Sequence, residues 1–415
     1  MTSESLFEKD QARHQESSPI PPKKLRFKSQ IRDELLLTPE TISQQMIKKN
    51  KAFTLKWESG TPEANYDLAF KLLNRTMKSS NKIRRFELGW KEHQPMSDKH
   101  LFHISQTLKK LPCLTGLHLG LGFTSKITDK GLFHLSKALK RLSSLENLNL
   151  NFGSLLKISD APILQISKSL KTFPRLKSLR LCCLICPNLT DASLLTLGED
   201  LKKVRTIQNL DLDFSFFCQI TDRGVDGLTK NLKKLGSLQR LSLDFYQHPQ
   251  ISESGFESLG RNLKELAHLK EILLVFGGRT RTKIPDIGLD ILGKHLKELV
   301  SLQKLTLHWR YPRGMTDSGI ERLIGHLKEF ASLKEVNLKF DEYSQISTSG
   351  RKMMKTFLES NKAFKKTQIE FVDFRKADIE ARNKQLRKIA LFAVLTAIFL
   401  PFVIYFIRRA LGINK

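Results

Sequence analysis

The sequence predicts an α/β solenoid of about 10–11 strand–helix repeats of 31 residues, followed by one C-terminal transmembrane helix. Three observations lead to this fold class. An apolar alternation typical of a strand recurs every 31 residues, leucines at helical spacing follow it, and a helix-start signal stands between them in constant register. One strand and one helix cannot enclose a core, so each copy has to stack on its neighbours.

The copy at residues 207–236 shows the pattern clearly. Leu210, Leu212 and Phe214 alternate with polar residues, which is the period of a strand with one buried face. The leucines of its second half are spaced by about four, which is the period of an amphipathic helix. The second apolar strand position recurs at Phe86, Leu117, Leu148, Leu179, Leu210, Leu241 and Ile272, continues at Leu305, Val336 and Ile369, and is extended backwards by Leu55.

The helix-start signal is a hydroxyl residue followed by an acidic one. The hydroxyl can accept a hydrogen bond from a first-turn amide, and the acid complements the positive end of the helix dipole. The signal occurs at Ser97-Asp98, Thr128-Asp129, Ser159-Asp160, Thr190-Asp191, Thr221-Asp222 and Thr316-Asp317, and in weaker form at Ser252-Glu253, Pro285-Asp286 and Ser347-Thr348. A glycine follows it at Gly131, Gly224, Gly255, Gly288, Gly319 and Gly350, which predicts a first turn that lies close to the adjacent copy.

The strand text L-x-x-L-x-L, as in Leu114-Leu117-Leu119 and Leu238-Leu241-Leu243, resembles the leucine-rich repeat family, and the helical second halves resemble its ribonuclease-inhibitor-like branch. The resemblance implies a horseshoe-shaped solenoid with parallel strands on the concave face and helices on the convex face. It covers residues 51–372.

One feature departs from that family. The asparagine that usually follows the strand and holds a backbone ladder is missing from this chain. One position earlier stands an apolar series that the alternation places inside, so we expect an aromatic spine in place of the ladder. Its members are Leu121, Phe152, Cys183, Phe214, Phe245, Phe276, Trp309 and Phe340.

The segments outside the repeats differ in composition. Residues 1–50 are polar and proline-punctuated, which predicts a mostly disordered segment with a short capping helix. Acidic residues interrupt any early apolar run, so we expect no secretory signal peptide. Residues 373–388 are expected to form a charged helical linker, residues 389–407 a transmembrane helix, and residues 408–415 a short basic tail.

The predicted membrane anchor contains 19 consecutive residues without a charge. At about 1.5 Å per residue this length is close to a bilayer core of about 30 Å. A buried helix of a soluble protein is the alternative interpretation. The anchor residues of the prediction are Ile389, Leu391, Leu395, Phe399, Phe402 and Ile407. A single span near the C-terminus resembles tail-anchored proteins, with the repeats in the cytosol and the anchor in the mitochondrial outer membrane or the endoplasmic reticulum.

The net charge is +28, from 70 basic and 42 acidic residues, which favours anionic partners. One lysine per copy falls in the same register near the end of each helix, and these lysines are expected to form a basic edge. Two interpretations stay open. The lysines complement the negative helix ends, or they contact anionic lipid or an acidic partner. The basic edge comprises Lys109, Lys140, Lys171, Lys202, Lys233 and Lys264.

The outward strand positions predict a polar concave face of mixed charge, suited to protein partners. A solvated strand surface is the simpler interpretation of any single residue there. The candidate partner-binding residues are Asn147, Asn149, Asn151, Arg180, Asp211, Asp213, Arg240 and Asp244. This face lacks aromatic residues for base stacking, so nucleic acid is not the expected partner.

We find no motif for catalysis, cofactor binding or metal binding. Cys183-x-x-Cys186 lacks a second ligand pair and is interpreted as core thiols. The sequence therefore predicts a membrane-tethered, cytosol-facing protein–protein interaction scaffold without catalytic activity. The alternatives are an RNA-binding protein that uses the basic edge, and a substrate-recognition arm of a ubiquitin ligase.

Overall fold

In a computed structural model of the chain, the structure describes residues 52–57, 70–71, 73–74, 83–90, 96–122, 126–216, 219–278, 286–311, 314–341 and 345–372. The predicted N-terminal segment, charged linker, transmembrane helix and basic tail lie outside these residues. All elements described below belong to the repeats.

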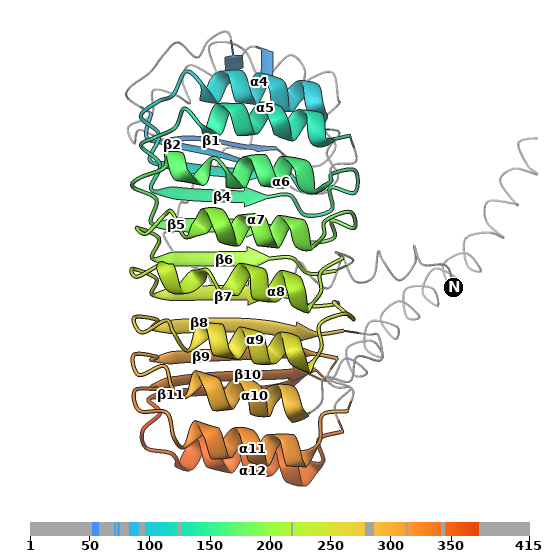
Figure 1. The fold of residues 1–415 in the computed structure, drawn as a ribbon, viewed down its shortest axis with the longest axis vertical. Helices are drawn as coiled ribbons and strands as arrows, with labels where there is room; N and C mark the ends of the chain where they lie inside the picture. Colours follow the sequence, from blue (N-terminus) through green and yellow to red (C-terminus); the bar gives the residue numbers. More distant parts are fainter. Residues whose placement is uncertain are drawn as a thin grey trace, which may run out of the picture. The chain divides into compact units, whose positions relative to one another are not determined.

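The repeats form one sheet of 11 parallel strands, hydrogen-bonded in chain order from first to last (Figure 1). Because each strand pairs with the next copy's strand, the sheet grows by one strand per copy. The strands are β1 (Ala52–Trp57), β2 (Arg85–Trp90), β3 (Gly116–Gly120), β4 (Asn147–Asn151), β5 (Ser178–Cys182), β6 (Asn209–Asp213), β7 (Arg240–Asp244), β8 (Glu271–Gly277), β9 (Lys304–Arg310), β10 (Glu335–Asp341) and β11 (Lys366–Val372).

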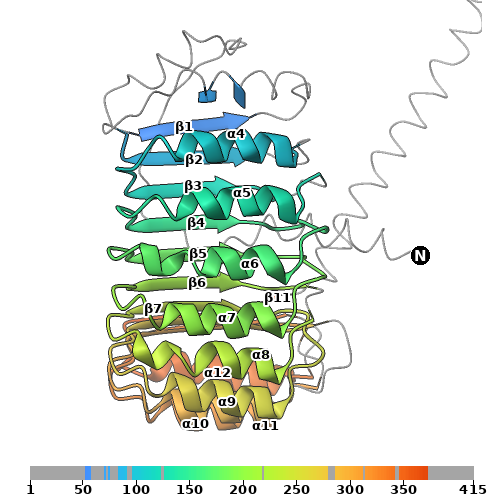
Figure 2. The same cartoon turned by 45° about the horizontal axis from the view of Figure 1, so that its top comes forward.

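A helix follows most strands, and the helices stack in chain order along one face of the sheet (Figure 2). They are α4 (Asp98–Leu108), α5 (Asp129–Leu139), α6 (Asp160–Ser167), α7 (Asp191–Leu201), α8 (Asp222–Thr229), α9 (Glu253–Leu263), α10 (Asp286–Leu296), α11 (Asp317–Leu327) and α12 (Thr348–Ser360), with short 3₁₀ turns η1 (Leu170–Thr172) and η2 (Leu232–Lys234). This arrangement confirms the predicted strand–helix solenoid.

The predicted apolar spine is confirmed. All eight of its members are buried, and the rings of Phe245, Phe276 and Trp309 lie in contact from copy to copy. The ring centroids of Phe245 and Phe276 are 6.3 Å apart, and those of Phe276 and Trp309 are 5.7 Å apart. Phe340 continues the series by stacking on Phe371 at 5.7 Å. Each ring therefore completes the core of the neighbouring copy.

Backbone hydrogen bonds between neighbouring copies continue past the strand ends, where the family's asparagine ladder would lie. Phe214 N–H donates to the Asp244 carbonyl at 3.0 Å, and Phe216 N–H donates to the Tyr246 carbonyl at 2.9 Å. Phe216 adopts a left-handed conformation with φ 60°, which turns its amide toward the next copy. The same conformation occurs at Ser154, Ile185, Gln247 and Tyr311. Direct backbone pairing thus replaces the side-chain ladder.

The register at the two ends of the sheet corrects the predicted alignment. Phe86 pairs with Phe53, so Leu55 is the partner of Leu88 instead. Val336 pairs with Thr367, and Ile369 therefore matches the following inner position. Both predictions were wrong by two residues, because a shift of two keeps the same strand face inward and the apolar pattern alone does not distinguish the alternatives.

The acid of each helix-start signal has a second role that the sequence analysis did not identify. Asp191 Oδ1 accepts the Thr221 amide of the next copy at 2.8 Å, and Asp191 Oδ2 accepts the Thr221 hydroxyl at 2.7 Å. The same hydroxyl accepts the Arg223 amide at 3.2 Å, so it caps its own helix while it binds the previous one. We call the whole series the aspartate ladder. It joins Asp98 to Thr128, Asp129 to Ser159, Asp160 to Thr190, Asp191 to Thr221, Asp222 to Ser252, Asp286 to Thr316 and Asp317 to Ser347.

The recurring glycine makes room for this carboxylate. A Cβ placed on Gly224 would lie 2.2 Å from Asp191 Oδ1, and one on Gly319 would lie 2.2 Å from Asp286 Oδ1. Where Ser193 takes the glycine position, its hydroxyl donates to Asp160 Oδ1 at 2.5 Å. The predicted close approach between copies is therefore confirmed, and the neighbour is the aspartate of the previous copy.

The aspartate ladder is interrupted once. Glu253 stands in the aspartate position of α9, and the next helix-start residue is Pro285. Proline has neither an amide hydrogen nor a hydroxyl, so it cannot donate to the preceding copy.

We predict that Asp191→Ala lowers the free energy of unfolding by about 1–3 kcal/mol, because the partly buried Thr221 amide loses its acceptor. Urea unfolding followed by circular dichroism measures this change. Glu253→Ala is the matched control, since Glu253 is exposed and the next helix-start residue in the sequence, Pro285, has no donor for it, and its effect should stay within about 0.5 kcal/mol. Equal losses in the two variants would contradict the ladder.

Candidate functional site

The sheet face that points away from the helices carries all eight candidate partner-binding residues. We call it the outer face. Alternate strand positions lie on it and are mostly partly exposed, while the intervening leucines are buried. The strand register brings the eight residues into neighbouring rows on β4 to β7. Their predicted placement on one surface is confirmed.

Three of these residues hold the turns that follow their strands. Asn151 Oδ1 accepts the Gly153 amide at 2.8 Å, Asp213 Oδ1 accepts the Ser215 amide at 3.0 Å, and Asp244 Oδ1 accepts the Tyr246 amide at 2.9 Å. Each side chain thus takes part in a local structural bond at the edge of the outer face. Their polarity alone does not indicate partner binding.

The charged residues of the outer face are largely paired with one another. Arg180 lies 3.3 Å from the Asp211 carboxylate on the next strand. Arg240 donates to Asn209 Oδ1 at 2.6 Å and lies 3.7 Å from Glu271. Further along the sheet, Lys304 pairs with Glu335 at 3.2 Å and Lys339 with Glu370 at 3.4 Å. The mixed charge predicted for this face is therefore mostly neutralised within it.

Asn147 and Asn149 are the candidates that keep their polar groups available. Neither makes a side-chain hydrogen bond with any residue that the structure describes, and Asn147 is exposed. On β3, Gly116 lies beside Asn147 and His118 lies beside Asn149, and on β5 their register partners are Ser178 and Arg180. The outer-face positions of β3 and β4 carry no acidic, lysine or arginine side chain, and we call them the uncharged strip. This strip can offer amide donors and acceptors to a partner.

Two aspartates on neighbouring strands are direct register partners on the outer face. Asp213 pairs with Asp244 across β6 and β7. Burial, followed by the charge of Asp213, raises the pKa of Asp244 to about 8. The Cys182 thiol donates to Asp213 Oδ2 at 3.4 Å, and burial raises the pKa of this thiol. The Asp244 carboxyl group therefore carries less negative charge at neutral pH than the sequence suggests.

The predicted basic edge lies where each helix ends and the chain turns back toward the next strand. Lys109, Lys140, Lys202 and Lys264 are C-cap residues of α4, α5, α7 and α9, as the register predicted. In the two remaining copies the α-helix ends earlier, at Lys168 and Lys230. Lys171 and Lys233 lie instead in the 3₁₀ turns η1 and η2. The expectation of one uniform helix end was wrong for these two copies.

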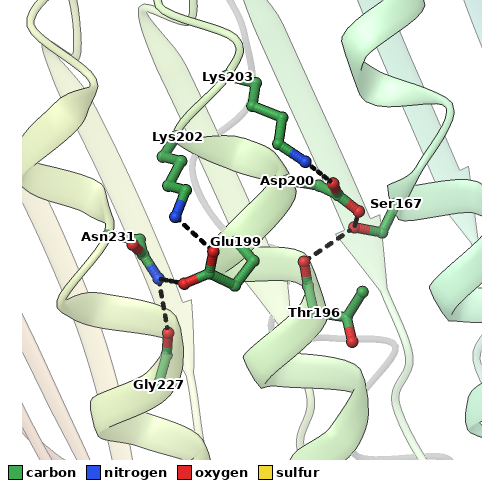
Figure 3. A network of polar contacts seen from close by, with 8 residues as sticks. All are labelled: Ser167, Thr196, Glu199, Asp200, Lys202, Lys203, Gly227 and Asn231. Carbon is green, nitrogen blue, oxygen red and sulfur yellow. Dashed lines mark hydrogen bonds and ion pairs between the residues drawn. The ribbon is translucent and has the colours of Figure 1, made fainter.

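Part of the basic edge is neutralised by acids on the helices. Lys202 pairs with Glu199, and Lys203 lies 2.7 Å from the buried Asp200 (Figure 3). Glu199 also accepts a hydrogen bond from Asn231 at 3.1 Å, and Asp200 accepts one from Ser167 at 3.0 Å. This network joins the ends of α6, α7 and α8, so these lysines take part in packing between copies.

Other cations of the edge make no direct ion pair with any residue that the structure describes. They lie in the helix ends and in the turns that lead into β5, β6 and β7. The unpaired cations are Lys140, Arg141, Lys168, Lys171, Arg175, Arg205, Lys230, Lys233 and Lys234. All of them are exposed. Lys168 and Lys230 were missed by the sequence analysis, because the early helix ends were not recognised.

Of the cysteines that the structure describes, Cys182, Cys183 and Cys186 are buried and Cys113 is partly exposed. Cys183 and Cys186 are fully buried, and Cys113, Cys182, Cys183 and Cys186 form no disulfide. Among the described residues, no group of three histidine, cysteine or acidic side chains is placed to hold a metal ion.

The predicted membrane anchor falls outside the described residues. Within the part of the chain that the structure describes, no helix has both the length and the apolar character needed to cross a membrane.

Comparison with known proteins gives matches to solved structures but no sequence match. No protein-family model and no curated protein sequence matches the chain. A chain in the crystal structure of the Rad7 and Elc1 complex in yeast matches with 14% sequence identity and a TM-score of 0.26, covering 70% of this chain and 86% of that chain. The evidence for a leucine-rich-repeat-like solenoid is the chain's own parallel sheet with a helix after most strands.

We predict that Asp244 makes a contribution to the stability of the folded chain that falls as the pH rises from about 4 to about 8, and that Asp244→Asn removes this contribution. The pKa of Asp244 is raised from 3.8 to about 8, so the folded state holds the proton more tightly than the unfolded state does. The resulting stability is fully present below about pH 4 and is lost as the pH passes 8.

Urea midpoints across this range measure the effect. The difference between variant and wild type should grow with pH in favour of the variant and become constant above about pH 8. Glu271→Gln serves as the control, because Glu271 on the same face already lies near Arg240. A difference for Asp244→Asn that does not change with pH would contradict the raised pKa.

Proposed function

We propose that the chain is a non-enzymatic scaffold that binds a protein partner through the outer face of its sheet, while residues 389–407 hold it at a membrane. The observation that carries the partner-binding part is the uncharged strip of β3 and β4. There Asn147 and Asn149 keep their amide groups available, whereas the charged residues further along the face pair with one another.

This strip suits an extended polypeptide segment. A carboxamide can donate and accept hydrogen bonds at once, which matches the alternating donors and acceptors of a peptide backbone. On β3, Gly116 and Gly120 leave space beside Asn147 and Asn151, and the His118 imidazole beside Asn149 adds another polar group. An extended segment laid along β3 and β4 would therefore meet polar groups without displacing an existing ion pair.

The outer face favours a protein partner over nucleic acid. At the outer-face positions of β2 to β11, no phenylalanine, tyrosine or tryptophan is available for base stacking. Arg180 and Arg240 on the same face already lie near Asp211 and Glu271, so they are less available to a phosphate backbone.

The membrane part of the proposal is supported by the sequence of residues 389–407. Six basic residues precede this segment after Phe371 and three follow it, which favours a cytosolic repeat region. The mitochondrial outer membrane and the endoplasmic reticulum are the proposed locations. Tethering would confine the outer face to the membrane surface and raise its effective concentration for partners there.

We predict that a photoreactive amino acid at position 149 of the full chain crosslinks a discrete partner in cells, because this position lies in the middle of the uncharged strip. Mass spectrometry of the purified adducts identifies the partner. The matched control carries the same group at position 294, which is exposed on helix α10. Adducts that are identical at the two positions, or confined to position 294, would reject the outer face as the binding surface.

We predict that the full chain remains in the membrane pellet after alkaline carbonate washing, whereas a chain ending at Lys388 is released. The physical reason is the loss of the 19-residue uncharged segment. Immunoblotting of pellet and supernatant measures the distribution. Retention of the shortened chain, or release of the full chain, would remove the tether from the proposal.

A further inference from the structure

We infer that the basic edge between α5 and η2 rests on an anionic membrane surface and binds lipid phosphate groups. This inference deepens the proposed function, because it gives the tethered repeats an orientation on the membrane.

The unpaired cations are concentrated in the two copies whose helices end early. The first group is Lys168, Lys171 and Arg175, around η1. The second group is Lys230, Lys233 and Lys234, around η2, two copies further on. No acidic residue occurs between 161 and 190 or between 227 and 243. The early helix ends therefore coincide with two stretches of edge that carry only positive charge.

The positive edge ends where acidic residues enter the same register. Lys264 lies 3.3 Å from Glu298, and Lys297 lies 2.7 Å from Glu329. These glutamates belong to the following copies and neutralise the lysines from the side. The C-terminal half of the edge is thus paired between copies, while of the edge cations from Lys140 to Lys234 only Lys202 and Lys203 are paired, each with an acid of its own helix. A role limited to complementing helix ends would not require this difference, since the helices of both halves end at the same edge.

The shape of the basic edge favours a planar surface over a protein groove. The cations follow one another from copy to copy along the turns, and most of them are lysines. Lysine is a compact, flexible point charge that does not require the fixed planar geometry of an arginine–carboxylate pair. Mobile phosphate groups of a lipid layer can adjust to such a row, and anionic lipid surfaces attract basic segments within a Debye length.

A surface hollow of about 290 Å³ lies at the end of this positive stretch. It is lined by Gly236, Ser237, Gln239, His268, Lys270 and Ser301. Lys270 and the two serine hydroxyls are suitable donors to a phosphate group. A lipid headgroup at the edge would therefore find both charge and hydrogen-bond donors at this point.

The proposed orientation is compatible with the connection to residues 389–407. The chain leaves β11 at the opposite ends of the strands from the basic edge. Residues 373–388 can extend to about 50 Å at roughly 3.3 Å per residue, whereas a six-residue strand spans only about 20 Å. The tether can therefore reach a membrane on which the basic edge rests, and the outer face stays free for a partner.

The test uses the full chain mixed with vesicles of phosphatidylcholine alone or of phosphatidylcholine with phosphatidylserine. Flotation measures binding, and lysine acylation followed by mass spectrometry measures which side chains are covered. We expect Lys168, Lys171, Lys230, Lys233 and Lys234 to react several-fold less on the phosphatidylserine vesicles. Lys137 and Lys294, which are exposed on α5 and α10, serve as controls and should not change. High salt should remove the difference.

The outcomes distinguish membrane binding by the basic edge from membrane binding by residues 389–407. If the chain floats with both vesicle types and all lysines react equally, the edge inference is overturned and the tether stands. If it floats only with phosphatidylserine and is released by salt, the edge stands without the tether. Flotation with neither type overturns both. Protection of the same lysines by RNA or an acidic protein, without protection by phosphatidylserine, also overturns the lipid assignment.

A variant with Lys168, Lys171, Lys230 and Lys233 changed to glutamine tests the inference a second way. Glutamine retains a polar side chain at these exposed positions, so the fold should be kept, which circular dichroism checks. The variant should lose the salt-sensitive preference for phosphatidylserine. Glutamine at Lys137 and Lys294 should have no effect, and a preserved preference in the four-site variant would overturn the inference.

Discussion

The fold depends on a carboxylate that belongs to one copy and completes the helix start of the next. Asp191 illustrates it, since both of its oxygens accept hydrogen bonds from Thr221, whose hydroxyl caps helix α8. A helix start leaves amide groups unpaired, and burial without a partner is costly. The aspartate ladder satisfies them with a group from outside the copy. Strand pairing on one side and this ladder on the other therefore fix the spacing between copies.

The repeat, the elements within it and the buried faces could be predicted from the sequence, because they follow from periodicities of two and four in a 31-residue frame. The helix starts at Thr221 and Thr316 were predicted for the same reason. The second role of the aspartates could not be, since their partners lie 30 positions away and no local pattern reveals the contact. Leu55 and Ile369 were misaligned because two consecutive inner positions of a strand are chemically alike.

The early ends of α6 and α8 could not be predicted from the sequence for a different reason. Ser169 and Thr229 donate hydrogen bonds back to carbonyl groups four residues earlier, which competes with the regular helix. Ser105 and Thr107 make the same type of bond in α4, yet that helix runs on to Leu108. Hydroxyl residues therefore do not mark the end by themselves. The sequence pattern therefore does not predict that Lys171 and Lys233 lie in 3₁₀ turns.

The distribution of charge also depends on three-dimensional pairing. The sequence correctly placed the candidate residues on the outer face and the lysines on one edge, but it could not tell which of them are already engaged. Arg180 and Asp211 lie 31 positions apart and pair with each other, whereas Asn147 makes no such contact with the described residues. A count of charged residues therefore overestimates the free charge on the outer face. It also hides the difference between the paired and the unpaired cations along the basic edge. What the fold adds is the separation between an uncharged strip and a concentrated basic edge.

Hydrogen–deuterium exchange of the intact chain tests the aspartate ladder most directly, because it reports on each helix start separately. The account predicts slow exchange at the amides of Thr128, Ser159, Thr190, Thr221 and Ser252, which donate to the preceding aspartate, and faster exchange in the first turn of α10, where Pro285 interrupts the ladder. Uniform exchange at all of these helix starts would contradict it.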